Sequence, residues 1–242
     1  MKNDILTVVW KERKALFKVQ GGRSRILLVM LTPILLAVIM PLTFDGPEEW
    51  TDTVFSMLIA VIVPMMLVGV TIPGSFAGER ERNTLETLLA SRLPDRAILI
   101  GKWSVSVVFA WLVTLAALLL GLVTVNIKFW GGGLVFYSPT VAIGDLLISL
   151  LIATTVAGAG VLISLRANTV QQASQTLMMI FLLPLVLFQV VAVFALRPMI
   201  EYLENMNGEQ LLIIVLLVLV VIDVIINALA ANRFQRAKLI LI

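Results

Sequence analysis

The chain has 242 residues, of which 60% are apolar and only 14% are charged. Soluble domains have about 25% charged residues, so this chain has too few polar side chains to cover a soluble core, and lipid must be its solvent over much of its surface. It contains no cysteine and no histidine. This excludes disulfides, thiol chemistry and the commonest general base and metal ligand. The net charge of +3 is too small to indicate nucleic-acid binding.

Residues 3–19 are predicted to form an amphipathic helix on the membrane surface, followed by a hinge at Gly21-Gly22. The apolar contact comes from Ile5, Leu6, Val8, Val9, Trp10, Leu16 and Phe17, and the polar face from Lys11, Glu12, Lys14 and Lys18. Such helices ordinarily serve as basic interfacial anchors, and contact with a partner protein is the alternative. Residues 1–25 are therefore expected to be a cytoplasmic region of their own.

The remainder of the chain is expected to be an all-α transmembrane domain with six spans, over residues 26–231. A span needs about 20 apolar residues, and the continuous apolar runs do not resemble the alternating strands of a membrane β-barrel. The predicted spans are Ile26–Phe44, Val54–Phe76, Trp103–Val125, Val141–Leu165, Gln175–Ala195 and Leu211–Ala231.

The basic residues predict the orientation of these spans. Of the 18 Lys and Arg residues, all except Lys128 and Arg197 fall on one side, whereas most of the acidic loop residues fall on the other. Because cytoplasmic loops carry the excess of Lys and Arg, both termini are predicted to be cytoplasmic. Residues 232–242 are then a cytoplasmic tail.

The cytoplasmic loop over residues 78–102 is the most informative part of the chain. Asn83 with Glu86 three residues later has the form of a capping pair, which predicts a short helix over residues 84–90. Its apolar face would consist of Leu85, Leu88 and Leu89, and Pro94 blocks a simple continuation. Such a helix can lie on lipid, pack on neighbouring helices or dock into a groove on another protein.

This loop resembles the signature of the ABC type-2 transporter permeases, approximately G-E-x-E-x-G-T-L-E-x-L-L-x-S-P followed by I-L-x-G-K. The chain reads Gly78-Glu79-Arg80-Glu81-Arg82-Asn83-Thr84-Leu85-Glu86-Thr87-Leu88-Leu89-Ala90-Ser91 and then Ile98-Leu99-Ile100-Gly101-Lys102. It departs from the pattern at Asn83, where the family usually has Gly, and at Arg92, where it usually has Pro. The predicted topology also resembles that family along the whole chain.

The resemblance implies the membrane subunit of an ATP-driven exporter in the inner (plasma) membrane of a prokaryote. Two cytoplasmic ATPase subunits would bind ATP and Mg, and a second permease subunit, identical or homologous, would complete the pathway. This chain would hold no cofactor or metal and no catalytic residue, and it has no phosphate-binding loop, because Arg96 stands where that motif requires Gly. The implied ATPase-coupling residues are Glu79, Arg80, Glu81, Arg82, Thr84, Leu85, Glu86, Leu88 and Leu89.

Polar residues within the predicted spans are the candidates for the substrate pathway or for helix packing. Asp223 and Asn227 lie one turn apart on the same face of the sixth span, and Gln189 is a lone polar group in the fifth. Asp145 lies near the outer end of the fourth span, where an interfacial, water-accessible position is expected. Residues 196–210 are a candidate for short re-entrant helices, as the resemblance implies.

Two further classes of function remain as alternatives. An ion-coupled secondary transporter or channel would need several buried ionisable residues, for which Asp223 is the only good candidate. A membrane-embedded hydrolase is disfavoured by the lack of His, Cys and a deep carboxylate cluster. The transported substrate does not follow from the sequence.

Overall fold

The computed structural model describes all residues except 1, 18–22, 54, 85–91, 196–207 and 235–242. The side chains of residues 2, 17, 23–29, 185–195 and 208 also lie outside the description. All regular structure in the described part of the chain is helical. The helices are α1 (Lys2–Phe17), α2 (Arg23–Leu42), α3 (Glu48–Thr51), α4 (Phe55–Glu81), α6 (Asp95–Lys128), α7 (Pro139–Ser164), α8 (Val170–Ala195) and α10 (Gly208–Arg233).

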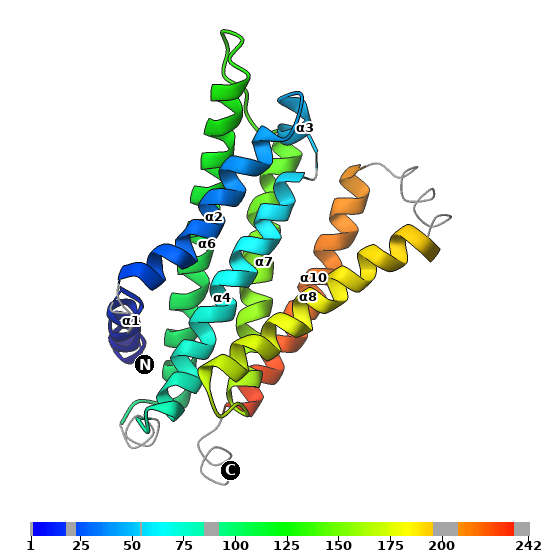
Figure 1. The fold of residues 1–242 in the computed structure, drawn as a ribbon. Coiled ribbons are helices and arrows are strands. Elements are labelled where there is room, and N and C mark those ends of the chain that lie inside the picture. The colour runs from blue at the N-terminus through cyan, green and yellow to red at the C-terminus, as the bar shows by residue number, and fades with distance from the viewer. Residues whose placement is uncertain (1, 18–22, 54, 85–91, 196–207, 235–242) are drawn as a thin grey trace.

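The helices α2, α4, α6 and α7 form a bundle in which α4 packs against both α6 and α7, while α2 packs on α6 (Figure 1). The helix α10 packs along α7, with Leu212 beside Gly144 and Asn227 beside Gly158. The helix α8 contacts α4 and α7 near one end of the bundle and diverges from it toward the other (Figure 1). The end at which α4 stops and α6 starts is called the loop end, and the opposite end the far end. The helix α1 packs on α6 at the loop end, where α10 also ends (Figure 1).

Small residues on α7 allow its neighbours to approach closely. A Cβ atom at Gly160 would lie 2.8 Å from Ile72 of α4, and one at Gly158 would lie 2.8 Å from Asn227 of α10. Helices in lipid gain little from the hydrophobic effect and associate largely through such close packing. The helix α7 is therefore the element on which α4 and α10 are assembled.

Each of the six predicted spans coincides with a helix: α2, α4, α6, α7, α8 and α10 in chain order. Over the described residues, α4, α6, α7 and α10 are long and apolar enough to cross a membrane, and Met30–Leu42 forms a shorter apolar helix. The prediction of an all-helical, multi-pass membrane protein is thereby confirmed. The helix predicted over residues 3–19 is present as α1 (Lys2–Phe17), and residues 18 and 19 lie outside the described residues. Its position on the membrane surface stays a prediction.

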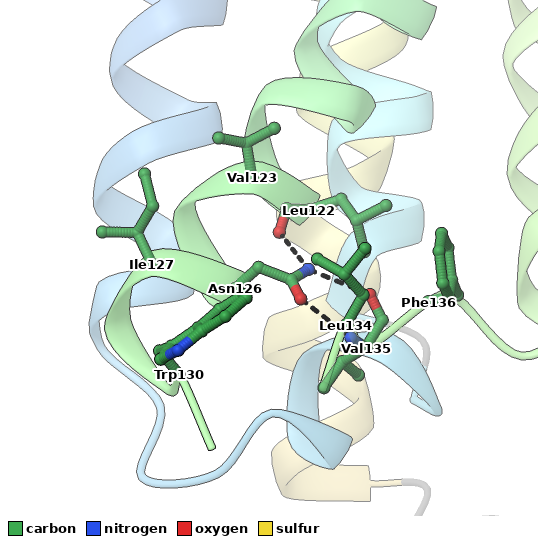
Figure 2. A pocket seen from close by; sticks show the side chains of 8 residues that line it. All are labelled: Leu122, Val123, Asn126, Ile127, Trp130, Leu134, Val135 and Phe136. Carbon is green, nitrogen blue, oxygen red and sulfur yellow. Dashed lines mark hydrogen bonds between the residues drawn. The ribbon is translucent and has the colours of Figure 1, made fainter. Parts of the chain in front are cut away.

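A cavity of about 500 Å³ lies beside the far end of α6 and the segment that follows it (Figure 2). Its lining is apolar apart from Asn126, and includes Leu122, Val123, Ile127, Trp130 and Val135. The Asn126 amide is engaged, since its Nδ2 donates to the carbonyl oxygens of Leu122 and Val135 and its Oδ1 accepts from the Val135 amide. The cavity thus presents an apolar surface whose one polar side chain holds the loop in place.

Candidate functional site

The C-terminal end of α4 is shaped by Asn83. Its φ of 56° places it in the left-handed region, its amide donates to the Arg80 carbonyl, and the Thr84 amide donates to the Glu79 carbonyl. This is the hydrogen-bond pattern of a Schellman motif, for which Gly and then Asn are the preferred residues. The prediction of Asn83 as the N-cap of the next helix is therefore corrected: Asn83 ends α4. The short helix predicted over residues 84–90 lies outside the described residues.

One turn before that end, Glu79 takes part in a buried ion cluster formed by Lys11, Glu12, Glu79 and Lys102. The Lys102 Nζ lies 3.0 Å from Glu79 Oε1 and 3.1 Å from Glu12 Oε1. The Lys102 side chain is only 1% exposed and that of Glu12 7%. Lys11, which is 53% exposed, adds a second cation 3.0 Å from Glu79 Oε1. The cluster joins α1, α4 and α6 at the loop end.

Every donor of the Lys102 ammonium has an acceptor. Besides the two carboxylates, Nζ donates to the Ser75 carbonyl oxygen at 2.7 Å, which accounts for its three N–H groups. The Ser75 hydroxyl donates to Glu12 Oε2 at 3.2 Å. A buried cation of this kind is tolerated only when it is paired and fully hydrogen-bonded, and removing one partner is strongly destabilising. The three helix segments are therefore held in one relative position.

Gly101 brings α1 close enough to α6 for this cluster to form. A Cβ atom at Gly101 would lie 2.6 Å from Val8 Cγ1, a separation that real Cβ contacts do not show. Val8 is 3% exposed, and Glu12 follows it one turn later on the same face of α1. The adjacent pair Gly101-Lys102 thus has two functions: the glycine admits α1, and the lysine binds it.

The neighbouring residues of α4 contact a different part of the chain. Arg80 Nη1 donates to the Ala167 carbonyl oxygen at 3.4 Å, and Glu81 Oε2 accepts from the Val170 amide at 3.1 Å. Val170 is the first residue of α8, where an acidic partner suits both the unpaired amides and the helix dipole. The end of α4 is thereby connected to the α7–α8 turn as well as to α1 and α6.

The remaining predicted coupling residues divide into two groups. Arg82 and Thr84 are exposed, and the Thr84 hydroxyl donates back to the Glu79 carbonyl oxygen. The others lie outside the described residues: Leu85, Glu86, Leu88 and Leu89. The structure therefore places Glu79, Arg80 and Glu81 in contacts within the chain, and Arg82 on the surface.

Sequence reasoning missed Glu12 and Lys102. Glu12 is expected on the polar face of the N-terminal helix, but it is buried, with only 5% of the residue exposed. Two features of the sequence could have pointed to these residues. Val8 and Glu12 are four residues apart and therefore share a face of the helix. Lys102 directly follows the glycine of the I-L-x-G-K pattern.

Two of the candidates within the spans, Asp223 and Asn227, belong to a second polar group, which connects α6, α7 and α10. Asp223 Oδ1 accepts from the Thr155 hydroxyl at 3.0 Å and from Asn227 Nδ2 at 2.8 Å. Trp103 Nε1 donates to Asn227 Oδ1 at 3.1 Å. These bonds are what polar residues that join helices in a bundle make. Gln189 lies in α8, and its side chain is outside the description.

Asp145 differs from its expected position. It lies near the far end of α7 but is only 2% exposed, because α4 and α10 cover that face; a Cβ at the preceding Gly144 would lie within 3 Å of both Met57 and Leu212. The expectation of a water-accessible interfacial residue is therefore wrong.

The helical fold, with its long apolar helices, defines a polytopic membrane protein. Comparison with known families adds its identity: the ABC-2 type transporter family matches residues 3–207. This match covers most of the 242 residues, so the chain belongs to the ABC-2 type transporter family. The match also confirms the resemblance seen in the loop at residues 78–102. The comparison with curated proteins returned no match.

Membership identifies the chain as the membrane component of an ABC transporter. It is a transport subunit and not the nucleotide-binding one, and the family implies an ATPase partner. The matched residues include α1, the ion cluster and the loop end, and they stop just before α10 begins at Gly208.

Proposed function

We propose that this chain is the permease subunit of an ATP-driven exporter and that a separate ATPase moves it through the loop end. The observation that carries the proposal is the buried ion cluster. Lys102 bridges Glu12 of α1 and Glu79 of α4 while belonging to α6. A force applied to the loop after α4 is then delivered to three helix segments together.

The assembly that follows from this proposal has two permease subunits, as a homodimer or a heterodimer, above two cytoplasmic ATPases. The loop end faces the cytoplasm in the inner membrane of a prokaryote, with six spans and both termini inside. The basic residues of the loop end support this orientation by the positive-inside rule. ATP and Mg are bound by the ATPases, and the docking contact is made by the exposed residues that follow Glu81.

Arg82 provides the test of docking, because it is exposed and lies at the junction of α4 and the loop. Reversing its charge with Arg82→Glu places a wrong charge in the proposed contact, and the expected loss of ATPase affinity is about tenfold, or about 1.4 kcal/mol. The measurement is co-purification of the ATPase from detergent-solubilised membranes, quantified by titration with purified ATPase.

The matched control is Arg233→Glu, at another exposed arginine, which lies at the end of α10. It makes the same change in net charge at the same end of the bundle, and it should leave ATPase binding unchanged. Equal binding by the parent chain and Arg82→Glu, with both inserted normally, would contradict docking at this position.

A further inference from the structure

At the far end of the α4–α7 interface, a carboxyl group is buried without a partner. Both oxygens of Asp145 and the hydroxyl of Ser56 are inaccessible to solvent and make no hydrogen bond of good geometry. The Ser56 side chain nevertheless faces the carboxyl, and Ser56 is completely buried. These two residues are called the far-end pair. Buried polar groups in native structures are almost always hydrogen-bonded, so an unsatisfied pair requires an explanation.

The surroundings of the far-end pair contain no compensating cation among the described residues. The helix α4 has no charged residue before Glu79, and α10 contributes Glu209, which accepts from Thr140. The acidic residues Glu48, Glu49 and Asp52 on the α3 side are exposed. Lys128 of α6 donates instead to the carbonyl oxygens of Leu42 and Phe44.

Tyr137, which precedes α7, is the remaining titratable neighbour. Burial is the main cause that raises the pKa of its hydroxyl above the usual range, and the nearby Asp145 adds to this. Tyr137 therefore stays neutral, accepting from Trp50 Nε1 and donating to the Leu118 carbonyl oxygen. It supplies no positive charge and no free donor to Asp145.

The oxygen atoms of the far-end pair are too few to bind a metal ion but are sufficient to bind a proton. A metal ion such as Ca²⁺ or Mg²⁺ takes about six or more oxygen ligands, whereas the pair offers three oxygens, and no group of three metal-binding side chains occurs in the described part of the chain. One proton is sufficient. A protonated Asp145 carboxyl presents a donor and an acceptor to the Ser56 hydroxyl, which itself has both. An ionised carboxylate buried without a partner would be very costly.

We propose that the far-end pair, Asp145 and Ser56, is a proton-binding site that is occupied while α4 and α7 are closed together. Separation of α4 from α7 at the far end admits water and releases the proton to it. At pH values above the range in which an exposed aspartate titrates, the closed state then binds one proton more than the open state. The ratio of open to closed states rises up to about tenfold per pH unit there, so acid favours closure.

The site itself is tested without the ATPase. The full chain, labelled with ¹³C at its aspartate carboxyl carbons, is placed in lipid nanodiscs and studied by solid-state NMR at neutral pH. The chain has six aspartates. A carboxyl resonance of the protonated type is expected, and it should be lost in Asp145→Asn and kept in the exposed control Asp52→Asn. In Ser56→Ala, which leaves the aspartate in place, the same resonance should shift.

An absent protonated resonance at neutral pH, or one that survives in Asp145→Asn, would overturn the proposal. If Asp145→Asn does not fold, the Ser56→Ala shift decides: no shift of any protonated resonance overturns it. The link to opening rests on the proposed function and has its own measurement, the pH dependence of far-end separation by spin labels at Asp52→Cys and Ile143→Cys. A pH-independent separation with a protonated Asp145 refutes only the link.

Discussion

The two ends of the bundle handle buried charge in opposite ways. At the loop end, Lys102 has two carboxylates and a carbonyl oxygen as acceptors. At the far end, Asp145 is equally buried and has no ion partner in the described residues. Glu79 Oε2 in the loop-end cluster makes no hydrogen bond, but each carboxylate there has a cation beside it. Such a cluster fixes its helices, because separating them leaves buried charges unpaired. A lone carboxyl is instead relieved when its helices part and water enters. The difference predicts a rigid loop end and a far end that opens.

The largest effect is expected from Lys102→Met. The substitution leaves Glu12 buried with one hydrogen bond from Ser75 and no cation. Breaking a buried ion pair from one side costs about 3–5 kcal/mol, so the free energy of unfolding should fall by that amount. Denaturant titration of the chain in mixed micelles measures it.

The triple variant Glu12→Gln, Glu79→Gln, Lys102→Met serves as the control for this prediction. Because all the buried charges are then removed together, most of the lost stability should return. A triple variant as unstable as Lys102→Met would mean that packing, not charge, holds the loop end together.

A smaller effect is expected from Gly101→Ala. The new Cβ would lie 2.6 Å from Val8 Cγ1, so α1 must move, and overpacking of this kind costs about 1–3 kcal/mol. In Gly74→Ala, by contrast, the Cβ meets no atom within 4 Å, and replacing a glycine within a helix should stabilise by about 0.5–1 kcal/mol. The same titration gives both values, and equal effects would refute the close contact between α1 and α6.

The smallest effect is expected at the far end, from Asp145→Asn. Asparagine has nearly the shape of a protonated carboxyl and can bond to Ser56 without a charge, so the unfolding free energy at neutral pH should change by less than about 1 kcal/mol. The equivalent change at the loop end, Glu12→Gln, removes a partner of Lys102 and should cost more. A loss at Asp145 as large as that at Glu12 would remove the contrast between the two ends.

Much of the fold could be predicted from the sequence, because long apolar runs determine spanning helices locally. Each predicted span coincides with a helix, and the N-terminal helix is also present. The prediction that Asn83 begins a helix was wrong. Its spacing to Glu86 fits a helix start, whereas its left-handed backbone conformation ends α4. That conformation also accounts for the glycine usual at this position in the signature.

The site was harder to predict, since its contacts join distant residues. Glu12 and Lys102 are ninety positions apart, and the packing of α1 on α6, with Val8 against Gly101, brings them together. Asp145 lies where an interfacial residue is expected, and its burial results from α4 and α10 covering that face. Composition along one helix does not contain that information.

The central claim, that the loop end moves as one unit when a separate ATPase binds ATP, can be tested with spin labels, because the chain has no native cysteine. Labels at the exposed positions Arg13→Cys and Arg96→Cys report the separation of α1 from α6 in the reconstituted complex. The prediction is that ATP leaves this distance distribution unchanged. ATP should instead alter the distance distribution between labels at the far end of the bundle, at Asp52→Cys and Ile143→Cys. A change between Arg13 and Arg96 on ATP binding would contradict the claim.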